Sequence, residues 1–123
     1  MKHMTGVESL KKIEDRASVE NIQELVGEFV KKVNPIKIVL FGSFAKGSYN
    51  EQSDYDFYLV VDDTSDVKET MRQARRASIH IKNRPVDIVV GTNSRFEIKR
   101  KMDYTQMVEG EVERDGILLY ERK

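Results

Sequence analysis

Apolar residues recur along this chain with two different spacings, and each spacing predicts a different kind of element. From Ser18 to the Asn34-Pro35 pair they return every three or four positions, which predicts an amphipathic helix; the stripe is Ile22, Leu25, Val26, Phe29, Val30 and Val33. The segment from Val67 to Ile81 has the same helical spacing, and its basic residues fall on the other faces. Both helices are expected to pack one face against a sheet.

Short apolar runs between turn residues predict strands. Three of them, Ile36 to Phe41, Tyr55 to Val61 and Pro85 to Val90, are continuous enough to be buried strands. A fourth, Ile117 to Tyr120, follows an Asp115-Gly116 turn and would complete the sheet at its edge. The expected fold class is α/β or α+β, with helices packed on a small mixed sheet of about four strands.

Two further helices are predicted from weaker sequence signals. Thr5 and Glu8 have the spacing of a capping box, so a short helix or extension is expected over residues 1–17. Another helix is expected from about Arg100 to Glu113, weakened by Gly110. Residues 18–123 would then form a single domain, which suits a chain of 123 residues without repeats or linkers.

The composition limits the disulfide bonds and metal sites that the chain can form. The chain has no cysteine and only two histidines, which excludes a disulfide framework and makes a structural zinc site improbable, so any metal should have oxygen ligands. The first 20 residues contain no apolar run of the kind found in a signal peptide or membrane span, and a cytoplasmic protein is expected. The 21 basic and 21 acidic residues cancel overall.

Charge is nevertheless segregated locally. The stretch from Ser48 to Asp63 has five acids and no base, whereas the stretch from Arg72 to Arg84 has five bases and no acid. Such neighbouring clusters suit a cation together with a polyanion, although solvated helix and loop faces give the same pattern.

A Gly-Ser turn follows the first predicted strand. Gly42 permits close approach of an anion, and Ser43 offers a hydroxyl beside the backbone N–H groups of a helix start, where phosphate oxygens are favoured. Gly42 and Gly47 have the spacing of a P-loop, but Ser48 stands where that motif requires Lys, so the P-loop interpretation is rejected.

Three aspartates fall on the second and third buried strands. Asp54 and Asp56 are two residues apart and point to one face of a strand, while Tyr55 and Phe57 point to the packed face. Asp87 interrupts the apolar run from Pro85 to Val90, and it faces Asp54 and Asp56 if the two strands are neighbours. A carboxylate cluster of this kind fits Mg²⁺ or Mn²⁺.

In combination, these features resemble the minimal nucleotidyltransferases of the DNA polymerase β-like superfamily. The resemblance covers about Ile36 to Tyr120 and rests on the Gly42-Ser43 turn, the Asp54-Tyr55-Asp56 triplet eleven positions after Ser43, and Asp87 on a separate strand. Lys46 stands in Ala-Lys-Gly where the family usually has Ala-Arg-Gly, so the charge is kept but the planar guanidinium is not.

The resemblance implies transfer of a nucleoside monophosphate, most often from ATP, to an acceptor hydroxyl. It assigns Asp54 and Asp56 to two metal ions, and gives Asp87 to the metal beside the acceptor, where it would also take up the proton. It assigns the β- and γ-phosphates to Gly42 and Ser43, with help from Lys46 or from a base of the Arg72 to Arg84 stretch.

A separate protein is the expected source of the acceptor, because the predicted core leaves little chain for an acceptor pocket. Small members of this family occur as antitoxins beside HEPN-domain toxins and modify a partner tyrosine with AMP, and others work with a substrate-binding subunit. The alternative is a non-catalytic module that binds nucleotide or masks a partner. RNA binding through the Arg72 to Arg84 stretch is disfavoured, because no stacking motif of the RRM or KH type accompanies it.

Overall fold

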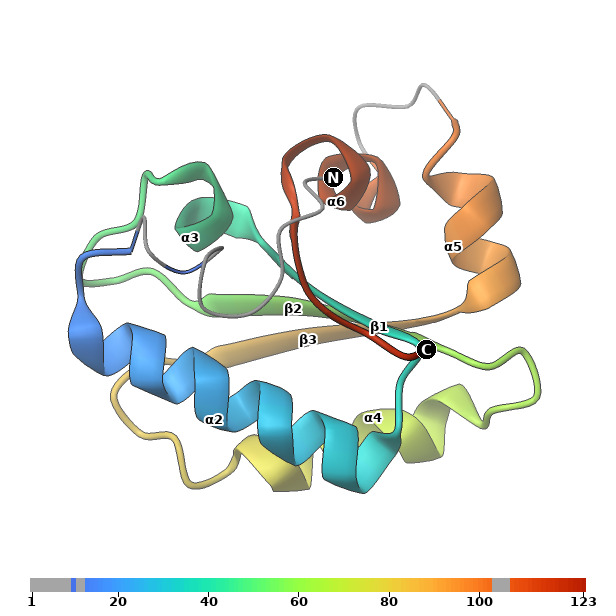
Figure 1. The fold of residues 1–123 in the computed structure, drawn as a ribbon, viewed down its shortest axis with the longest axis horizontal. Helices are drawn as coiled ribbons and strands as arrows, with labels where there is room; N and C mark the ends of the chain where they lie inside the picture. The colour runs from blue at the N-terminus through green and yellow to red at the C-terminus, as the bar shows by residue number, and fades with distance from the viewer. Residues whose placement is uncertain (1–9, 11–12, 103–106) are drawn as a thin grey trace.

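A mixed four-stranded sheet forms the middle layer of this computed structural model, which describes residue 10 and residues 13–102 and 107–123 (Figure 1). The strands are β1 (Lys37–Phe41), β2 (Tyr55–Val61), β3 (Val86–Thr92) and β4 (Ile117–Glu121), in the spatial order β3-β2-β1-β4. β1 is antiparallel to both β2 and β4, and β2 is parallel to β3. The expected fold class is confirmed, including the last strand at the edge.

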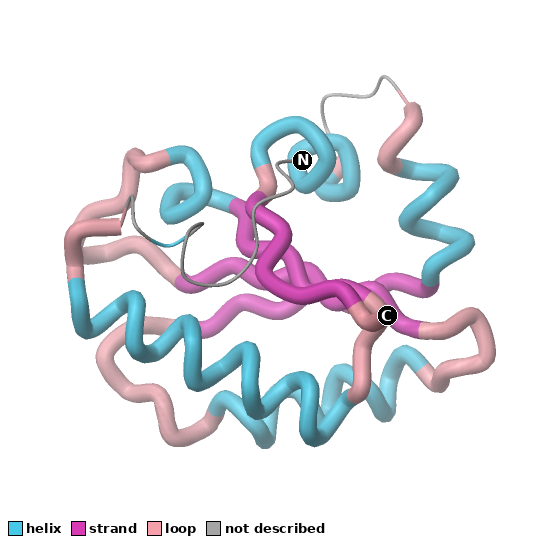
Figure 2. The backbone as a smooth tube through the Cα atoms, in the orientation of Figure 1, coloured by secondary structure: helices cyan, strands magenta, loops and turns pink. Residues whose placement is uncertain are grey.

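Helices cover both faces of this sheet. α2 (Arg16–Val33) and α4 (Val67–Ser78) lie side by side on one face, and α3 (Gly42–Lys46), α5 (Asn93–Lys99) and α6 (Val108–Asp115) lie on the other (Figures 1 and 2). Along the part of the chain that is described, no helix is long and apolar enough to cross a membrane.

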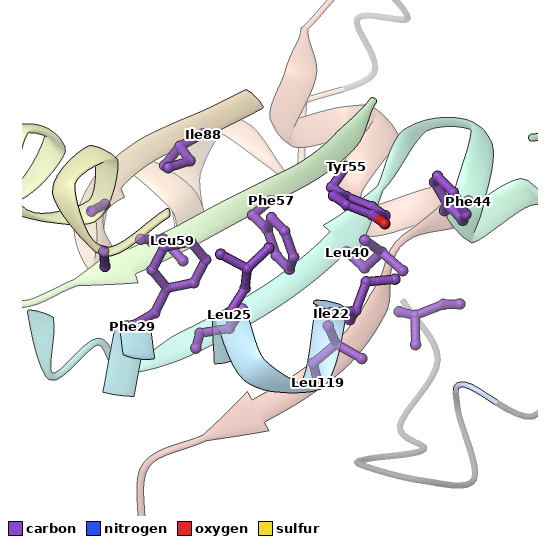
Figure 3. Close-up of a cluster of buried hydrophobic side chains, with 14 of the residues drawn as sticks. Ile22, Leu25, Phe29, Leu40, Phe44, Tyr55, Phe57, Leu59, Ile88 and Leu119 are labelled. Carbon is purple, nitrogen blue, oxygen red and sulfur yellow. The ribbon is translucent and has the colours of Figure 1, made fainter. Parts of the chain in front are cut away.

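The main core lies between the sheet and the α2/α4 layer. It takes the odd-numbered side chains of β2 together with the predicted stripe of α2 (Figure 3); the fully buried members include Ile22, Leu25, Phe29, Tyr55, Phe57 and Leu59. Phe29 meets Phe57 edge to face, with ring centroids 5.3 Å apart. Because Tyr55 and Phe57 enter this core, Asp56 between them is directed to the opposite face.

A second, smaller core lies under α5 and α6. Phe96 and Val112 pack there on Val39, Tyr58 and Val60. Within it, the buried carboxylate of Glu109 accepts hydrogen bonds from Tyr58 Oη at 2.7 Å and from Arg95 Nε at 3.2 Å, which ties α6 to β2 and α5. Because a buried carboxylate is stable only when paired, these contacts fix the position of α6.

The structure corrects the prediction of one helix from Arg100 to Glu113. α5 begins seven residues earlier, where Thr92 caps its N-terminus by accepting from the N–H of Arg95, and α6 is a separate helix. The two helices bury few residues of their own, so neither repeats its apolar spacing often enough to be seen in the sequence. The helix expected near Thr5 lies outside the described residues.

Candidate active site

Two of the three predicted aspartates are brought side by side by strand pairing. In the parallel ladder between β2 and β3, Asp56 is directly opposite Asp87. The backbone also pairs just before these residues, where the N–H of Tyr55 donates to the carbonyl of Pro85 at 3.0 Å. The condition that the sequence left open, that these two strands are neighbours, is therefore met.

The Gly-Ser turn packs directly against this aspartate pair. β1 ends at Phe41, which lies opposite Asp56, and the chain then turns at Gly42 with φ +73°. A Cβ atom placed on Gly42 would lie 2.1 Å from Oδ2 of Asp56, so only glycine fits there. Ser43 follows in the first turn of α3, whose backbone N–H groups have no partners within the helix.

The Asp56 carboxyl is electrostatically strained. Burial, together with the negative charges of Asp87, Asp54 and Glu111, raises its pKa to about 7. Asp87 acts more strongly than Asp54 and also shares a hydrogen bond with Asp56. A positively charged ligand placed between these groups would relieve the repulsion.

Asp54 contributes from the loop that leads into β2. It lies one residue before the strand, is partly buried, and is close enough to raise the pKa of Asp56. Within the described ranges, no three His, Cys, Asp or Glu side chains are already gathered as a complete metal site. The pair of Asp56 and Asp87 nevertheless fits Mg²⁺ or Mn²⁺, which bind through one or two carboxylates and take their other ligands from water and substrate phosphates.

Lys46 closes α3 beside a residue that the sequence did not single out. Its Nζ atom is 3.5 Å from Oε2 of Glu111 on α6, and its side chain remains 45% exposed. Glu111 is therefore a fourth carboxylate at the site, because it also acts on Asp56. No local signal could have identified it, since Glu109 and Glu113, two positions away on either side, are glutamates as well.

The tyrosines and ionisable residues outside this cluster have structural positions. Tyr55 and Tyr58 are fully buried, and Tyr49 stacks on Phe44 with ring centroids 4.5 Å apart. His80 is on the surface, with Nε2 2.9 Å from a carboxylate oxygen of Glu24. Arg84 is directed at the loop before β2, with its side chain only 9% exposed.

Comparison with known families gives a match that covers most of the chain. The family model described as Nucleotidyltransferase domain matches residues 22–118. Among curated proteins, a candidate protein adenylyltransferase of Methanocaldococcus jannaschii is 35% identical over 63 residues. That alignment covers 46% of this chain and 64% of the relative, so less than two thirds of the relative's length is matched.

Two solved structures share the fold. A candidate nucleotidyltransferase of Sulfolobus solfataricus superposes with a TM-score of 0.54 at 22% identity, covering 89% of this chain and 92% of the other. A toxin–antitoxin structure with AMP-PNP superposes with a TM-score of 0.51 at 21% identity, covering 85% of this chain and 73% of the other. At these identities the likeness is one of fold.

Gly42→Ala should destabilise the protein more than Gly47→Ala. Both positions have positive φ, but a Cβ on Gly47 meets nothing within 4 Å, whereas one on Gly42 meets the Asp56 carboxylate. Gly47→Ala should cost about 1 kcal/mol from backbone strain alone, and Gly42→Ala about 1–3 kcal/mol more because the carboxylate is displaced. Urea unfolding of both variants measures the difference, and equal losses would contradict the contact.

Asp56→Asn should stabilise the metal-free protein more at pH 8 than at pH 5. The folded protein raises the pKa of Asp56 from 3.8 to about 7, so this group favours folding most at pH values below 3.8, and that contribution is lost as the pH rises from 3.8 through about 7. Asparagine removes the charge at nearly the same volume. The expected gain at pH 8 is about 1–2 kcal/mol after allowance for the partial exposure of the carboxyl.

The measurement is thermal unfolding of both proteins in EDTA between pH 5 and pH 8. Asp62→Asn is the matched control, since that exposed acid lies on the same chain segment and pairs with Arg122. If wild type and Asp56→Asn change in parallel with pH, the repulsion described here is absent.

Proposed function

Because this chain belongs to the nucleotidyltransferase domain family, we propose that it transfers a nucleoside monophosphate, AMP from ATP in the first place, to a hydroxyl group of an acceptor. The observation that carries this proposal is the placement of Asp56 opposite Asp87 on parallel strands, directly beside the Gly42-Ser43 turn. Carboxylates that repel one another beside a phosphate-compatible turn suit a reaction that needs a divalent cation and a triphosphate together.

The proposed reaction breaks a phosphoanhydride bond of the nucleotide and forms a phosphodiester bond to the acceptor. The acceptor oxygen forms a bond to the α-phosphorus of the nucleotide, the bond from that phosphorus to the bridging oxygen breaks, and pyrophosphate leaves. Asp87, the exposed member of the pair, takes up the proton of the acceptor hydroxyl. Asp54, Asp56 and Asp87 would hold Mg²⁺ or Mn²⁺, which when bound supplies positive charge to the reacting phosphate.

The triphosphate is assigned to the other side of Asp56. Gly42 and Ser43 offer backbone N–H groups and a hydroxyl to the β- and γ-phosphates, and Lys46 adds a positive charge at the end of the same short helix. The pair with Glu111 keeps the Lys46 ammonium at this position while leaving it nearly half exposed. A triphosphate, which carries more charge than one carboxylate, competes with Glu111 for it.

The acceptor is assigned to a separate protein, in the narrowest form a tyrosine of a HEPN-type toxin. The fold is shared with a toxin–antitoxin structure that contains AMP-PNP, and a relative is named for protein adenylylation. The hollow of about 360 Å³ between α2 and α4 is lined by residues such as Lys32 and Arg76, on the helix layer away from the carboxylates, so it is not suited to present an acceptor to them.

Asp56→Asn should reduce the rate of AMP transfer by at least about a thousandfold, because the carboxylate assigned to both metal ions is lost. The assay follows label from α-labelled ATP in Mg²⁺ onto a co-expressed partner, with Asp62→Asn as a control of the same chemistry away from the site. Label transfer by Asp56→Asn at the wild-type rate would exclude the assignment.

Mass spectrometry tests the acceptor. A partner protein co-expressed from a neighbouring gene should gain mass in steps of about 329 Da, the mass that AMP adds to a hydroxyl, and fragmentation should locate the addition on tyrosine. A partner that co-purifies unmodified with the wild type in the presence of Mg²⁺ and ATP would instead favour a masking role without catalysis.

A further inference from the structure

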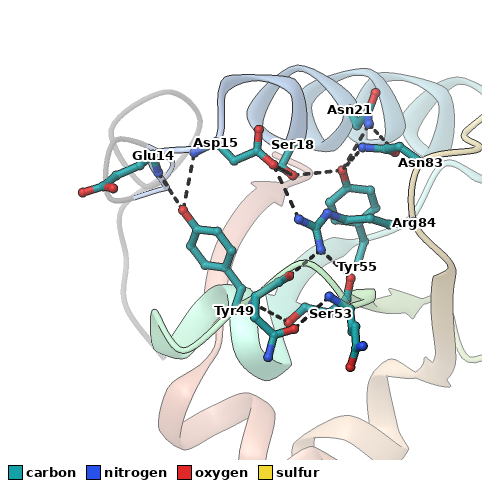
Figure 4. A network of polar contacts seen from close by, with 11 residues as sticks. Glu14, Asp15, Ser18, Asn21, Tyr49, Ser53, Tyr55, Asn83 and Arg84 are labelled. Carbon is teal, nitrogen blue, oxygen red and sulfur yellow. Dashed lines mark hydrogen bonds and ion pairs between the residues drawn. The ribbon is translucent and has the colours of Figure 1, made fainter.

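Arg84 differs from the other bases of the Arg72 to Arg84 stretch because it is buried. Its side chain is 9% exposed, whereas Arg72, with a side chain 63% exposed, faces solvent on α4. A buried guanidinium is stable only if its donors are satisfied, so its partners reveal what it holds. Its hydrogen-bond acceptors lie in the loop of residues 47–54, which connects α3 to β2, and its ion-pair partner Asp15 lies just before α2 (Figure 4).

The guanidinium bridges two carbonyl groups of that loop. Its Nη1 atom donates to the carbonyl of Asn50 at 2.7 Å and to that of Ser53 at 2.9 Å, and Nη2 is 3.5 Å from a carboxylate oxygen of Asp15. Bonds within the loop complete the turn: the N–H of Ser53 donates to the Asn50 carbonyl, and the N–H of Asn50 donates to Ser53 Oγ. Ser53 immediately precedes Asp54.

Aromatic rings fix the guanidinium from the other side. Its central carbon lies 5.0 Å from the centroid of Phe44 on α3 and 5.9 Å from that of Tyr55 on β2. Phe44 follows Ser43, and Tyr55 separates Asp54 from Asp56. One planar cation therefore touches each segment that carries a proposed site residue, and it lies three residues before Asp87 itself.

We propose that Arg84 is a positioning residue that holds the loop of residues 47–54 so that Asp54 faces Asp56 and Asp87. The inference that this loop serves a metal site rests on the proposed function. The contacts of Arg84 with the loop are present in the structure whether or not that function is correct. Asp54 lies outside β2, so no strand pairing fixes it, and loops without such ties are mobile. Arg84 supplies the missing tie through the carbonyl of the preceding residue.

The positioning role differs from the phosphate contact that the resemblance allows for a base of the Arg72 to Arg84 stretch. A residue that grips the β- and γ-phosphates must offer free donors at the mouth of the site, as the half-exposed Lys46 does. The donors of Arg84 are instead directed at backbone carbonyls and at Asp15, beneath the loop. In this role Arg84 positions Asp54 through the loop and does not contact the nucleotide.

The experiment compares Arg84→Met and Arg84→Lys with Arg75→Met, whose arginine is exposed on α4. Affinity for Mn²⁺ without nucleotide is measured by calorimetry or electron paramagnetic resonance. Hydrogen exchange is followed at the amides of Asn50, Gln52 and Ser53, with the amides of β2 and β3 as the reference. Neither readout depends on catalysis.

Arg84→Met should weaken Mn²⁺ binding by about tenfold or more and speed exchange in the loop selectively, because partners that orient a ligand typically contribute 10–100-fold to metal affinity. Arg84→Lys should fall between it and the wild type, since one ammonium cannot match the planar fork. Arg75→Met should match the wild type. If Arg84→Met does not fold, Arg84→Lys decides alone.

Wild-type Mn²⁺ affinity in Arg84→Met or, failing that, in Arg84→Lys would overturn the proposal. So would an equal rise of exchange in the loop and in β2 and β3, because that describes a purely structural role. If the wild type binds Mn²⁺ but transfers no label to any acceptor, the proposed function fails, while the same order of affinities still supports the role of Arg84.

Discussion

The parallel pairing of β2 with β3 is the constraint on which the rest of this molecule depends. It places two carboxylates at one register position, where their repulsion and partial burial raise the pKa of Asp56 to about 7. A slip of one residue would move Asp56 into the apolar core and Phe57 out of it, so the apolar core opposes any other register. The packing of apolar side chains on one face of the sheet thus keeps Asp56 and Asp87 close together on the other face, despite their repulsion.

The two helix layers have different roles around this strand pair. The α2/α4 layer covers the larger core and fixes the register of the strands (Figure 3). The other layer brings the groups that surround Asp56: α3 carries Ser43 and Lys46, and α6 carries Glu111. Because Glu109 anchors α6 through buried hydrogen bonds, Glu111 is held at the site by a contact in the core beneath it.

The sequence predicts these parts unevenly, for physical reasons. β2 was predicted at its observed limits because seven consecutive residues suit a buried strand. The sequence predicts that Asp87 faces Asp54 and Asp56 only on the condition that the two strands are neighbours. Strand order depends on contacts between residues distant in sequence. Glu111 and the role of Arg84 were not predicted: their hydrogen bonds and ion pairs join residues 31 or more positions apart, and no periodic pattern records such pairs.

Arg84 and Glu111 show how charge is used in a chain whose net charge is zero. The acidic stretch from Ser48 to Asp63 includes the loop carbonyls that Arg84 binds, so the basic and acidic stretches meet at Arg84. If every base of the stretch turned toward Asp54 and Asp56, the carboxylates would be neutralised and would have little affinity for a cation. Binding the backbone instead of the carboxylates lets Arg84 order the loop while leaving the negative charge of Asp54 available.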